Sequence, residues 1–171
     1  ALVRASAVEA LSKLARPELH AQLLAALEDP SADVRREAIV GTHRFAGSDA
    51  GPGDGTAAAF DRALVAQLEL EAGDNVWYTL FALQRRRAEA AREAFHAYAR
   101  SREPLERLFA TRGLGRIEPR GEDVAVLLRL VRDGDERVAA EAFVALGRHT
   151  GADVLAAAKR GVEHDDSHVS R

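Results

Sequence analysis

The stretch DPSADVRREAIVG, residues 29–41, predicts a turn followed by a helix. An Asp-Pro pair favours turn initiation, because proline fixes its own φ angle and restricts the residue before it. Val34, Ala38 and Gly41 follow at spacings of four and three residues, which places them on one side of a helix. The pattern therefore indicates a helix whose contact side is small enough to pack closely on a neighbour.

The same pattern recurs along the chain, and this recurrence decides the fold class. With Val34 as position zero, copies begin at Val3, Val34, Val76, Glu106, Val138 and Val169. Successive starts are 31, 42, 30, 32 and 31 residues apart. A single V-R-x-x-A pattern is common by chance, but five nearly even spacings predict a repeat of about 31 residues. The longest spacing contains the Gly- and Asp-rich stretch at residues 47–56, which predicts an inserted surface loop.

Each repeat predicts two helices separated by a turn. Apolar residues at helical spacing predict the first helices at residues 17–29, 57–72, 88–102, 122–134 and 152–162. The second helices begin near the valine–arginine pair, after turns that contain Pro, Gly or Asp. Small residues at positions plus four and plus seven of the second helices are expected to let neighbouring helices approach closely. β-branched residues are few and do not alternate with polar ones, so no strand is predicted.

The repeat resembles the short HEAT-like repeat of the phycobilin-lyase type, whose signature is D-x-x-V-R-x-x-A-x-x-A-L-G. The match is closest at Asp33-Val34-Arg35 with Ala38, and at residues 138–147. It is weakest in the middle, where Trp77 replaces the arginine and Glu106 replaces the valine. The resemblance covers essentially the whole chain. It implies an all-α fold, a right-handed α-solenoid (an armadillo-like α-α superhelix) of about five stacked helix pairs with one concave face.

Residues 1–171 are expected to form a single solenoid unit. Both ends fall at the same phase of the repeat, and neither carries the atypical capping sequence with which such arrays usually end. We therefore expect the sequence to be a segment of a longer array.

The composition excludes several classes of function. Cysteine is absent, which excludes disulfides, thiolate catalysis and zinc–sulfur sites. No apolar run approaches the roughly 20 residues of a membrane span. No phosphate-binding glycine loop, dinucleotide fingerprint or nucleophile elbow is present, so we expect no enzymatic activity, no cofactor and no metal site.

The overall charge is nearly balanced. The chain has 24 basic and 27 acidic residues and a net charge of −3, so the molecule as a whole has no strong attraction for nucleic acid. Lys13 and Lys159 are the only lysines, and the preference for arginine is typical of a bacterial gene rich in G and C.

A cation stands at position plus ten of every complete repeat. These residues are Lys13, Arg44, Arg86, Arg116 and Arg148. Stacked repeats would align them in a ridge, which has two interpretations. Cations near a helix C-terminus gain about 0.3–1 kcal/mol from the helix dipole and the bare carbonyl groups, which is a structural role. A ridge of cations would also suit an anionic partner.

The middle repeats hold the best candidates for a contact surface. In the family that the chain resembles, positions plus two, three, six and ten line the concave face, and here the first three of these positions include Arg36, Tyr78, Leu108, Phe109 and Arg112. Trp77 and Tyr78 also stand close in sequence to the run RRR, which contains Arg85 and Arg86. Trp, Tyr and Arg dominate interface hot spots, so this region predicts a contact patch. The alternative is that the apolar residues belong to the core and that the arginines form a solvated run.

Arginine and aspartate alternate at the turns, as in Asp33/Arg35 and Asp135/Arg137. We interpret these residues as structural, because charge-assisted hydrogen bonds can bridge adjacent repeats.

The leading hypothesis is a non-catalytic scaffold that binds another protein, or another domain of the same longer chain, on its concave helix face. Two alternatives stay open. The resemblance implies a phycobilin-lyase-like pigment-attachment enzyme or chaperone, which is an analogy at the level of the fold. The cation ridge favours nucleic-acid binding, and the net charge of −3 counts against it.

Overall fold

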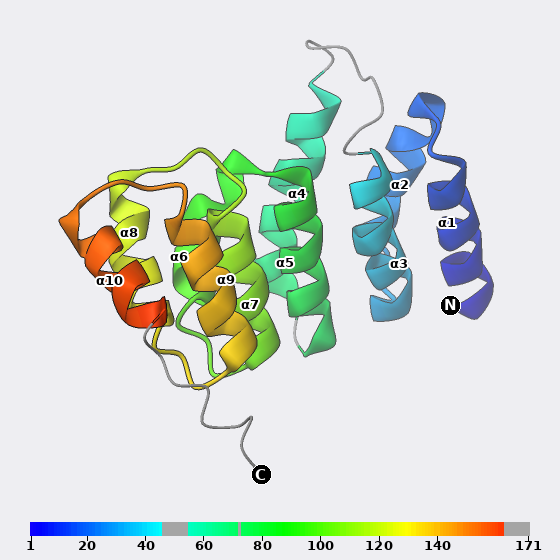
Figure 1. Ribbon diagram of the computed structural model, residues 1–171. Coiled ribbons are helices and arrows are strands. Elements are labelled where there is room, and N and C mark those ends of the chain that lie inside the picture. The colour runs from blue at the N-terminus through cyan, green and yellow to red at the C-terminus, as the bar shows by residue number, and fades with distance from the viewer. Residues whose placement is uncertain (46–54, 72, 163–171) are drawn as a thin grey trace.

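The described chain is built entirely from helices (Figure 1). The computed structural model describes residues 1–45, 55–71 and 73–162, and these ranges contain no strand. The α-helices are α1 (Leu2–Leu14), α2 (His20–Ala26), α3 (Ala32–Thr42), α4 (Thr56–Leu70), α5 (Asp74–Arg86), α6 (Arg92–Tyr98), α7 (Pro104–Leu114), α8 (Gly121–Leu130), α9 (Glu136–Leu146) and α10 (Ala152–Val162). Short 3₁₀ helices are η1 (Pro17–Leu19), η2 (His43–Phe45) and η3 (Glu89–Ala91).

The predicted helices are confirmed within the described residues, and the repeat start at Val169 lies outside them. The first helices are α2, α4, α6, α8 and α10, and the second helices are α1, α3, α5, α7 and α9. Pro17 opens η1 ahead of α2, where its missing N–H costs no hydrogen bond. Most of the predicted loop at residues 47–56 lies outside the described residues. The described chain resumes at Gly55, which precedes α4 with a φ angle of 70° that suits glycine.

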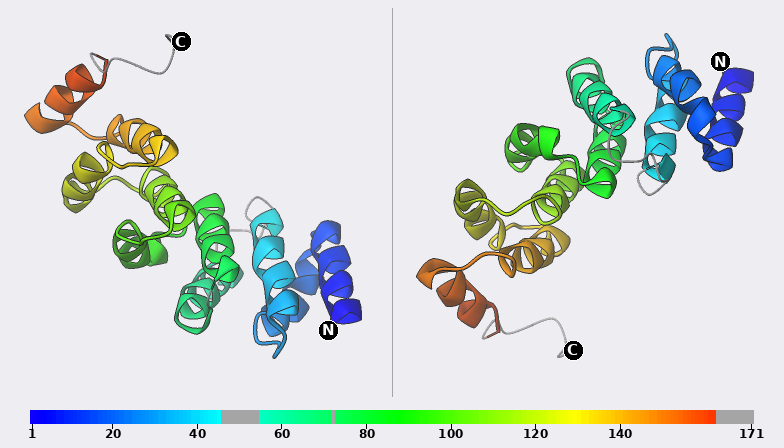
Figure 2. Two further views of the ribbon diagram at one scale, coloured as in Figure 1. Left: turned by 90° about the horizontal axis from the view of Figure 1, so that it is seen from below. Right: turned by 90° about the horizontal axis from the view of Figure 1, so that it is seen from above.

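The helices lie in two rows (Figures 1 and 2). In one row α1, α3, α5, α7 and α9 pack side by side in chain order. The other row holds α2, α4, α6, α8 and α10, and its helices also pack against the first row, as α2 does on α3 and α4 on α5. The helices α1 and α10 lie at opposite ends. Successive repeats therefore meet through helices of the same row.

The core fills the space between the rows. Its largest fully buried side chains come from both rows and include Leu23, Leu64, Phe95, Leu127, Ile39, Leu80 and Leu114. Position zero and position plus four are buried on α3, α5 and α9, as Val34 and Ala38 show, whereas Val3 and Ala7 on α1 are exposed. Burial of this apolar surface is the main contribution to stability.

Small residues at position plus seven allow neighbouring helices to approach closely, as predicted. A Cβ atom at Gly41 would lie 2.7 Å from the Cβ atom of Ser12 on α1. A Cβ atom at Gly113 would lie 2.5 Å from two ring atoms of Phe95 on α6. Any larger side chain at either position must therefore displace its neighbour.

In the second row, the ends of α2, α4 and α6 each accept a hydrogen bond from a side chain of the next helix of that row. These hydrogen bonds run from Gln67 Nε2 to the Leu27 carbonyl at 2.9 Å, from Tyr98 Oη to the Leu68 carbonyl at 3.3 Å, and from Arg129 Nη2 to the Ala99 carbonyl at 2.9 Å. The three donors recur every 31 residues. Each of these donors therefore satisfies a carbonyl group that the end of the preceding helix in the same row leaves without a partner.

Candidate interaction surface

The cation at plus ten in the α5 repeat is bound within the fold. Arg86 donates to the Asp61 carboxylate at 2.6 Å, and its side chain is only 3% exposed. It also donates to the carbonyl oxygen of Thr42, at the end of α3, at 3.1 Å. This buried guanidinium group therefore joins α5 to the preceding helix of the same row and offers no surface to a partner.

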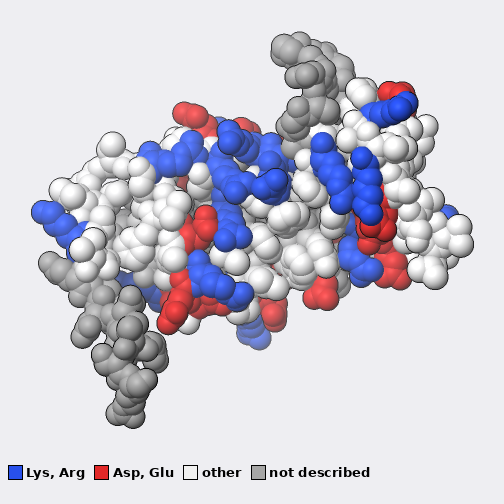
Figure 3. All heavy atoms as spheres, turned by 45° about the vertical axis from the view of Figure 1, so that its right-hand side comes forward, with Lys and Arg blue, Asp and Glu red and all other residues white. Residues whose placement is uncertain are grey.

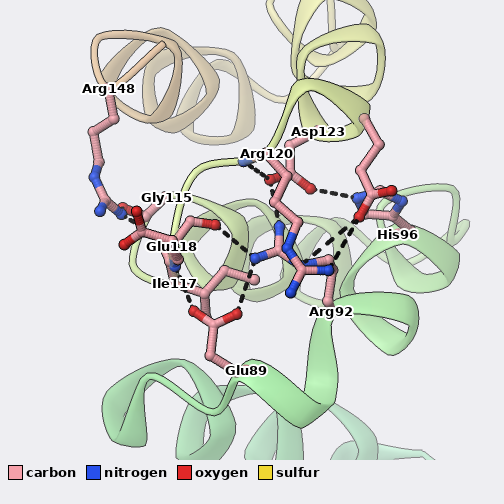
Figure 4. Close-up of polar contacts among 10 residues, drawn as sticks. Glu89, Arg92, His96, Gly115, Ile117, Glu118, Arg120, Asp123 and Arg148 are labelled. Atoms are coloured by element: carbon pink, nitrogen blue, oxygen red, sulfur yellow. Dashed lines mark hydrogen bonds and ion pairs between the residues drawn. The ribbon is translucent and has the colours of Figure 1, made fainter.

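Two other plus-ten arginines reach back in the same way. Arg148 donates to the carbonyl oxygens of Gly115 and Ile117 at 2.7 and 2.6 Å (Figure 4). Arg44 donates to the hydroxyl of Ser12 at 2.5 Å. For Arg86 and Arg148 the helix-end interpretation holds with one correction: the carbonyl groups that they bind belong to the preceding repeat and not to their own helix. Arg44 binds a side-chain hydroxyl instead. The predicted ridge is therefore not a continuous row of free cations.

The arginine at plus one makes a second regular contact between repeats. Arg107 donates through Nε and Nη2 to both oxygens of Asp133, each at 2.8 Å. Its Nη1 atom also donates to the carbonyl oxygens of Ser101 and Arg102, both at 3.0 Å. The acid lies in the turn between the two helices of the next repeat. We call this ion pair, between the arginine at plus one and the acid of the next turn, the staple.

Equivalent staples join Arg4 to Asp29 and Arg35 to Glu71. The prediction that turn charges bridge adjacent repeats is thus confirmed for Arg35, although its acceptor is Glu71 and not an aspartate of the V-R motif. Arg137 stands at minus one, because plus one of its repeat is Ala139, and it pairs with Asp135 at the start of its own helix at 2.8 Å.

We expect the staple to be worth about 1–2 kcal/mol, because both side chains are mostly buried and the pair is bidentate. A double-mutant cycle of Arg107→Ala and Asp133→Ala, measured by urea unfolding, gives this coupling energy. The matched control is a cycle on Arg137 and Asp135, where the arginine is exposed, and there we expect below about 0.5 kcal/mol. Equal coupling in the two cycles would contradict a role for the staple in joining repeats.

The plus-one arginine is absent from two repeats: plus one is Ala139 on α9, and on α5 the staple toward the α7 repeat is replaced by an aromatic residue. Trp77 stands at plus one, where Arg4, Arg35 and Arg107 stand in their repeats, and Ser101 stands where the turns that they contact have the acid. The Ser101 hydroxyl still accepts from the Glu103 backbone N–H at 3.1 Å, as Asp133 accepts from Asp135 at 3.0 Å. This turn therefore keeps the hydrogen bond seen in the turn at Asp133, although neither residue of the ion pair is present here.

An aromatic strip occupies this position on the first row of helices. It consists of His43, Trp77, Tyr78, Phe81 and Phe109, from η2, α5 and α7. The Trp77 ring stacks on Tyr78 at a centroid distance of 3.7 Å and on Phe109 at 5.8 Å. Phe81 meets His43 and Phe109 edge to face at 5.5 and 5.6 Å. Trp77, Tyr78 and Phe81 are half-buried, so the strip retains exposed apolar area.

An arginine cluster lies at the ends of α5 and α7. It consists of Arg85, Arg87, Arg112 and Arg116, and Figure 3 shows basic side chains gathered over the middle of the molecule. Arg112 pairs with Glu141 at 2.8 Å and lies over the Phe109 ring at 5.8 Å. Partial burial and the charges of Arg85, Arg112 and Arg87 lower the pKa of Arg116, against the opposing effect of Glu141. The cluster is thus a site of uncompensated positive charge.

The structure corrects the placement of some predicted contact residues and brings others together. Leu108 is only 5% exposed, and Phe109 is 9% exposed beneath Arg112, so neither forms open surface. Arg36 pairs with Asp33 of its own helix at 3.0 Å. The remaining predicted residues, Trp77, Tyr78, Arg85, Arg112 and Arg116, belong to the strip or the cluster. Phe81 was not among the predicted contact residues, although its ring lies between His43 and Phe109.

A buried charge network lies in the second row (Figure 4). Asp123 is fully buried and accepts from Arg92 Nη1 at 2.5 Å, His96 Nε2 at 2.7 Å and the Arg120 backbone N–H at 3.0 Å. Burial opposes ionisation of this carboxyl, but the three hydrogen bonds outweigh it and hold the pKa of Asp123 below its usual value. Arg92 also donates to the Glu118 carbonyl oxygen at 2.6 Å. The network ties α6 to the start of α8.

We expect the free energy of unfolding to fall in acid. The staple to Arg107 lowers the pKa of Asp133 in the folded state, as the network does for Asp123. The unfolded chain therefore binds more protons than the folded chain as pH falls below about 4, and stability that is complete above this pH is lost. Urea unfolding from pH 5 to pH 2.5 measures the loss, and Asp133→Asn should make it shallower. An unchanged pH profile in this variant would contradict the assignment.

The comparisons with known proteins leave the site to be judged on its geometry. No protein-family model matches the chain, and no curated protein is significantly similar to it. Among the helices of the described ranges, none combines the length and apolar character needed to cross a bilayer.

Proposed function

We propose that the chain is a HEAT-like α-solenoid segment that acts as a non-catalytic interaction scaffold. Its partner is another protein, or another domain of the same longer chain. The architecture is supported by the 31-residue repeat, by the two rows of helices and by the staples and back-bonding side chains that recur between repeats. In this arrangement each repeat contacts its neighbours only, which leaves an extended surface for binding.

The observation that carries the proposal is the surface formed by the aromatic strip and the arginine cluster. Elsewhere the described plus-one and plus-ten side chains are mostly engaged within the fold, as Arg86 and Arg107 illustrate. At the α5–α7 junction partly exposed aromatic rings take the place of the staple. The nearby arginines also outnumber the acidic residues that pair with them. Aromatic residues and arginine are the residue types most enriched in interface hot spots.

Site-specific photocrosslinking tests the proposal. A photoreactive phenylalanine analogue replaces Tyr78, and a control carries it at the exposed Ala125 in the other row. In lysate we expect a protein adduct from position 78, none from position 125, and loss of the adduct when excess unlabelled wild-type protein competes. Competitor with Arg85→Glu and Arg116→Glu should fail to remove it. Adducts that are equal at both positions, or absent from position 78, would overturn the proposal.

A further inference from the structure

We propose that the occupant of this surface is an acidic amphipathic protein segment, with carboxylates against the arginine cluster and an apolar side chain against the aromatic strip. This inference rests on the proposed function and adds the chemistry of the partner to it.

The first support is the charge that remains in the cluster. Four guanidinium groups face a single paired carboxylate, Glu141. Among the described residues, the exposed side chains of Arg85, Arg87 and Arg116 have no hydrogen-bond or ion-pair partner. The negative ends of the α5 and α7 dipoles offset part of their mutual repulsion. Carboxylates supplied by a partner would offset the rest, through charge-assisted and bidentate hydrogen bonds.

The second support is the apolar surface beside the charge. Trp77, Tyr78 and Phe81 remain partly exposed although each ring packs against another ring of the strip. Burial of this area under an aliphatic or aromatic side chain is favourable in proportion to the area removed from water. An occupant that is acidic throughout would leave the strip uncovered, so the occupant must be amphipathic.

The ring packing favours a protein segment over nucleic acid. Bases bind aromatic side chains by stacking on an open ring face. Here Trp77 is stacked on both Tyr78 and Phe109, and Arg112 lies over Phe109. Ring faces of the strip are therefore largely taken up within the chain, whereas exposed edges still offer contact to an apolar side chain.

The geometry also sets the spacing in the partner. Tyr78 and Arg85 are both on α5 and seven residues apart, which corresponds to about 10 Å along the helix axis. A helical partner would place its apolar anchor and its nearest carboxylate about two turns apart, at positions i and i+7. The remaining carboxylates would face α7 beyond that point.

Selection from a random 16-residue peptide library tests the inference, with the full chain as bait and a variant carrying Arg85→Glu and Arg116→Glu as counter-selection. We expect enriched peptides to combine Asp or Glu with Leu, Ile or Phe. The chain has one tryptophan, and it lies in the strip, so its fluorescence reports titration of an enriched peptide. Replacing the peptide's Glu by Gln, or its apolar anchor by Ala, should weaken binding by about tenfold or more.

A matched control separates this surface from general charge effects. The variant with Arg100→Glu and Arg132→Glu makes the same charge change at exposed arginines outside the cluster, and it should bind within about twofold of wild type. Enriched peptides without acidic residues, or binding that survives Arg85→Glu and Arg116→Glu, would overturn the inference. So would tighter binding of a 12-nucleotide oligothymidylate than of any peptide. If position 78 crosslinks to a protein while no acidic peptide is enriched, the proposed function stands and this partner chemistry is wrong.

Discussion

Replacing Asp123 by alanine is expected to lower the free energy of unfolding by about 3–5 kcal/mol. The carboxylate is fully buried, and its removal leaves the guanidinium group of Arg92 buried without its closest counter-charge. It also removes the acceptor of His96 and of the backbone N–H that opens α8. Chemical denaturation at pH 7 measures the change.

The neighbouring Glu122→Ala is the matched control. Glu122 is mostly exposed and lies 3.9 Å from Arg92, so its removal should change stability by less than about 0.5 kcal/mol. A loss below about 1 kcal/mol for Asp123→Ala would show that Arg92 is adequately compensated by Glu89 and the Glu118 carbonyl alone.

Gly113→Ala is expected to destabilise the protein by about 2 kcal/mol, although alanine is intrinsically the better helix former by about 1 kcal/mol. The added Cβ atom would lie 2.5–2.6 Å from three ring atoms of Phe95. That ring is fully buried in the core, so it can move away only by displacing other core side chains. The shift of the thermal midpoint, with the urea midpoint, measures the change.

Gly121→Ala supplies the comparison, because nothing lies within 4 Å of a Cβ atom at that position. It should be neutral or stabilising by up to about 1 kcal/mol. If Gly113→Ala is also neutral, α6 and α7 can separate without cost, and close approach is not what selects glycine there.

The repeat predicts the helices because their signals are local. Val34, Ala38 and Gly41 follow a single helical period, and each turn carries its own Pro, Gly or Asp. The hydrogen-bond partners of the polar residues could not be predicted from such local signals. Arg86 bonds a backbone carbonyl 44 residues earlier, and a carbonyl has no signature in sequence. The sequence indicated that this cation binds a helix end, but not that the end belongs to the preceding helix of the row, α3.

The burial of individual side chains on the middle helices could not be predicted from the sequence either. Leu108 holds the same repeat position as Arg36 and Tyr78, yet it is buried while they are not. Helical spacing gives the direction of a side chain around its own axis, and not the neighbours that cover it; α7 packs against α5, α6, α8 and α9. One missed signal was available, because Arg92 and Asp123 are 31 residues apart, one full repeat.

The exchange of one staple for aromatic rings gives the junctions different responses to temperature and ionic strength. Salt screens the charge pairs that join Arg4, Arg35 and Arg107 to the repeats after them, most of all the exposed Arg4. Contacts between rings are insensitive to salt, but the hydrophobic contribution behind them weakens on cooling. The junction between α5 and α7 has no staple for salt to weaken, and salt also screens the repulsion within its arginine cluster. Salt that loosens the neighbouring junctions is therefore expected to favour this one, whereas cooling weakens it most.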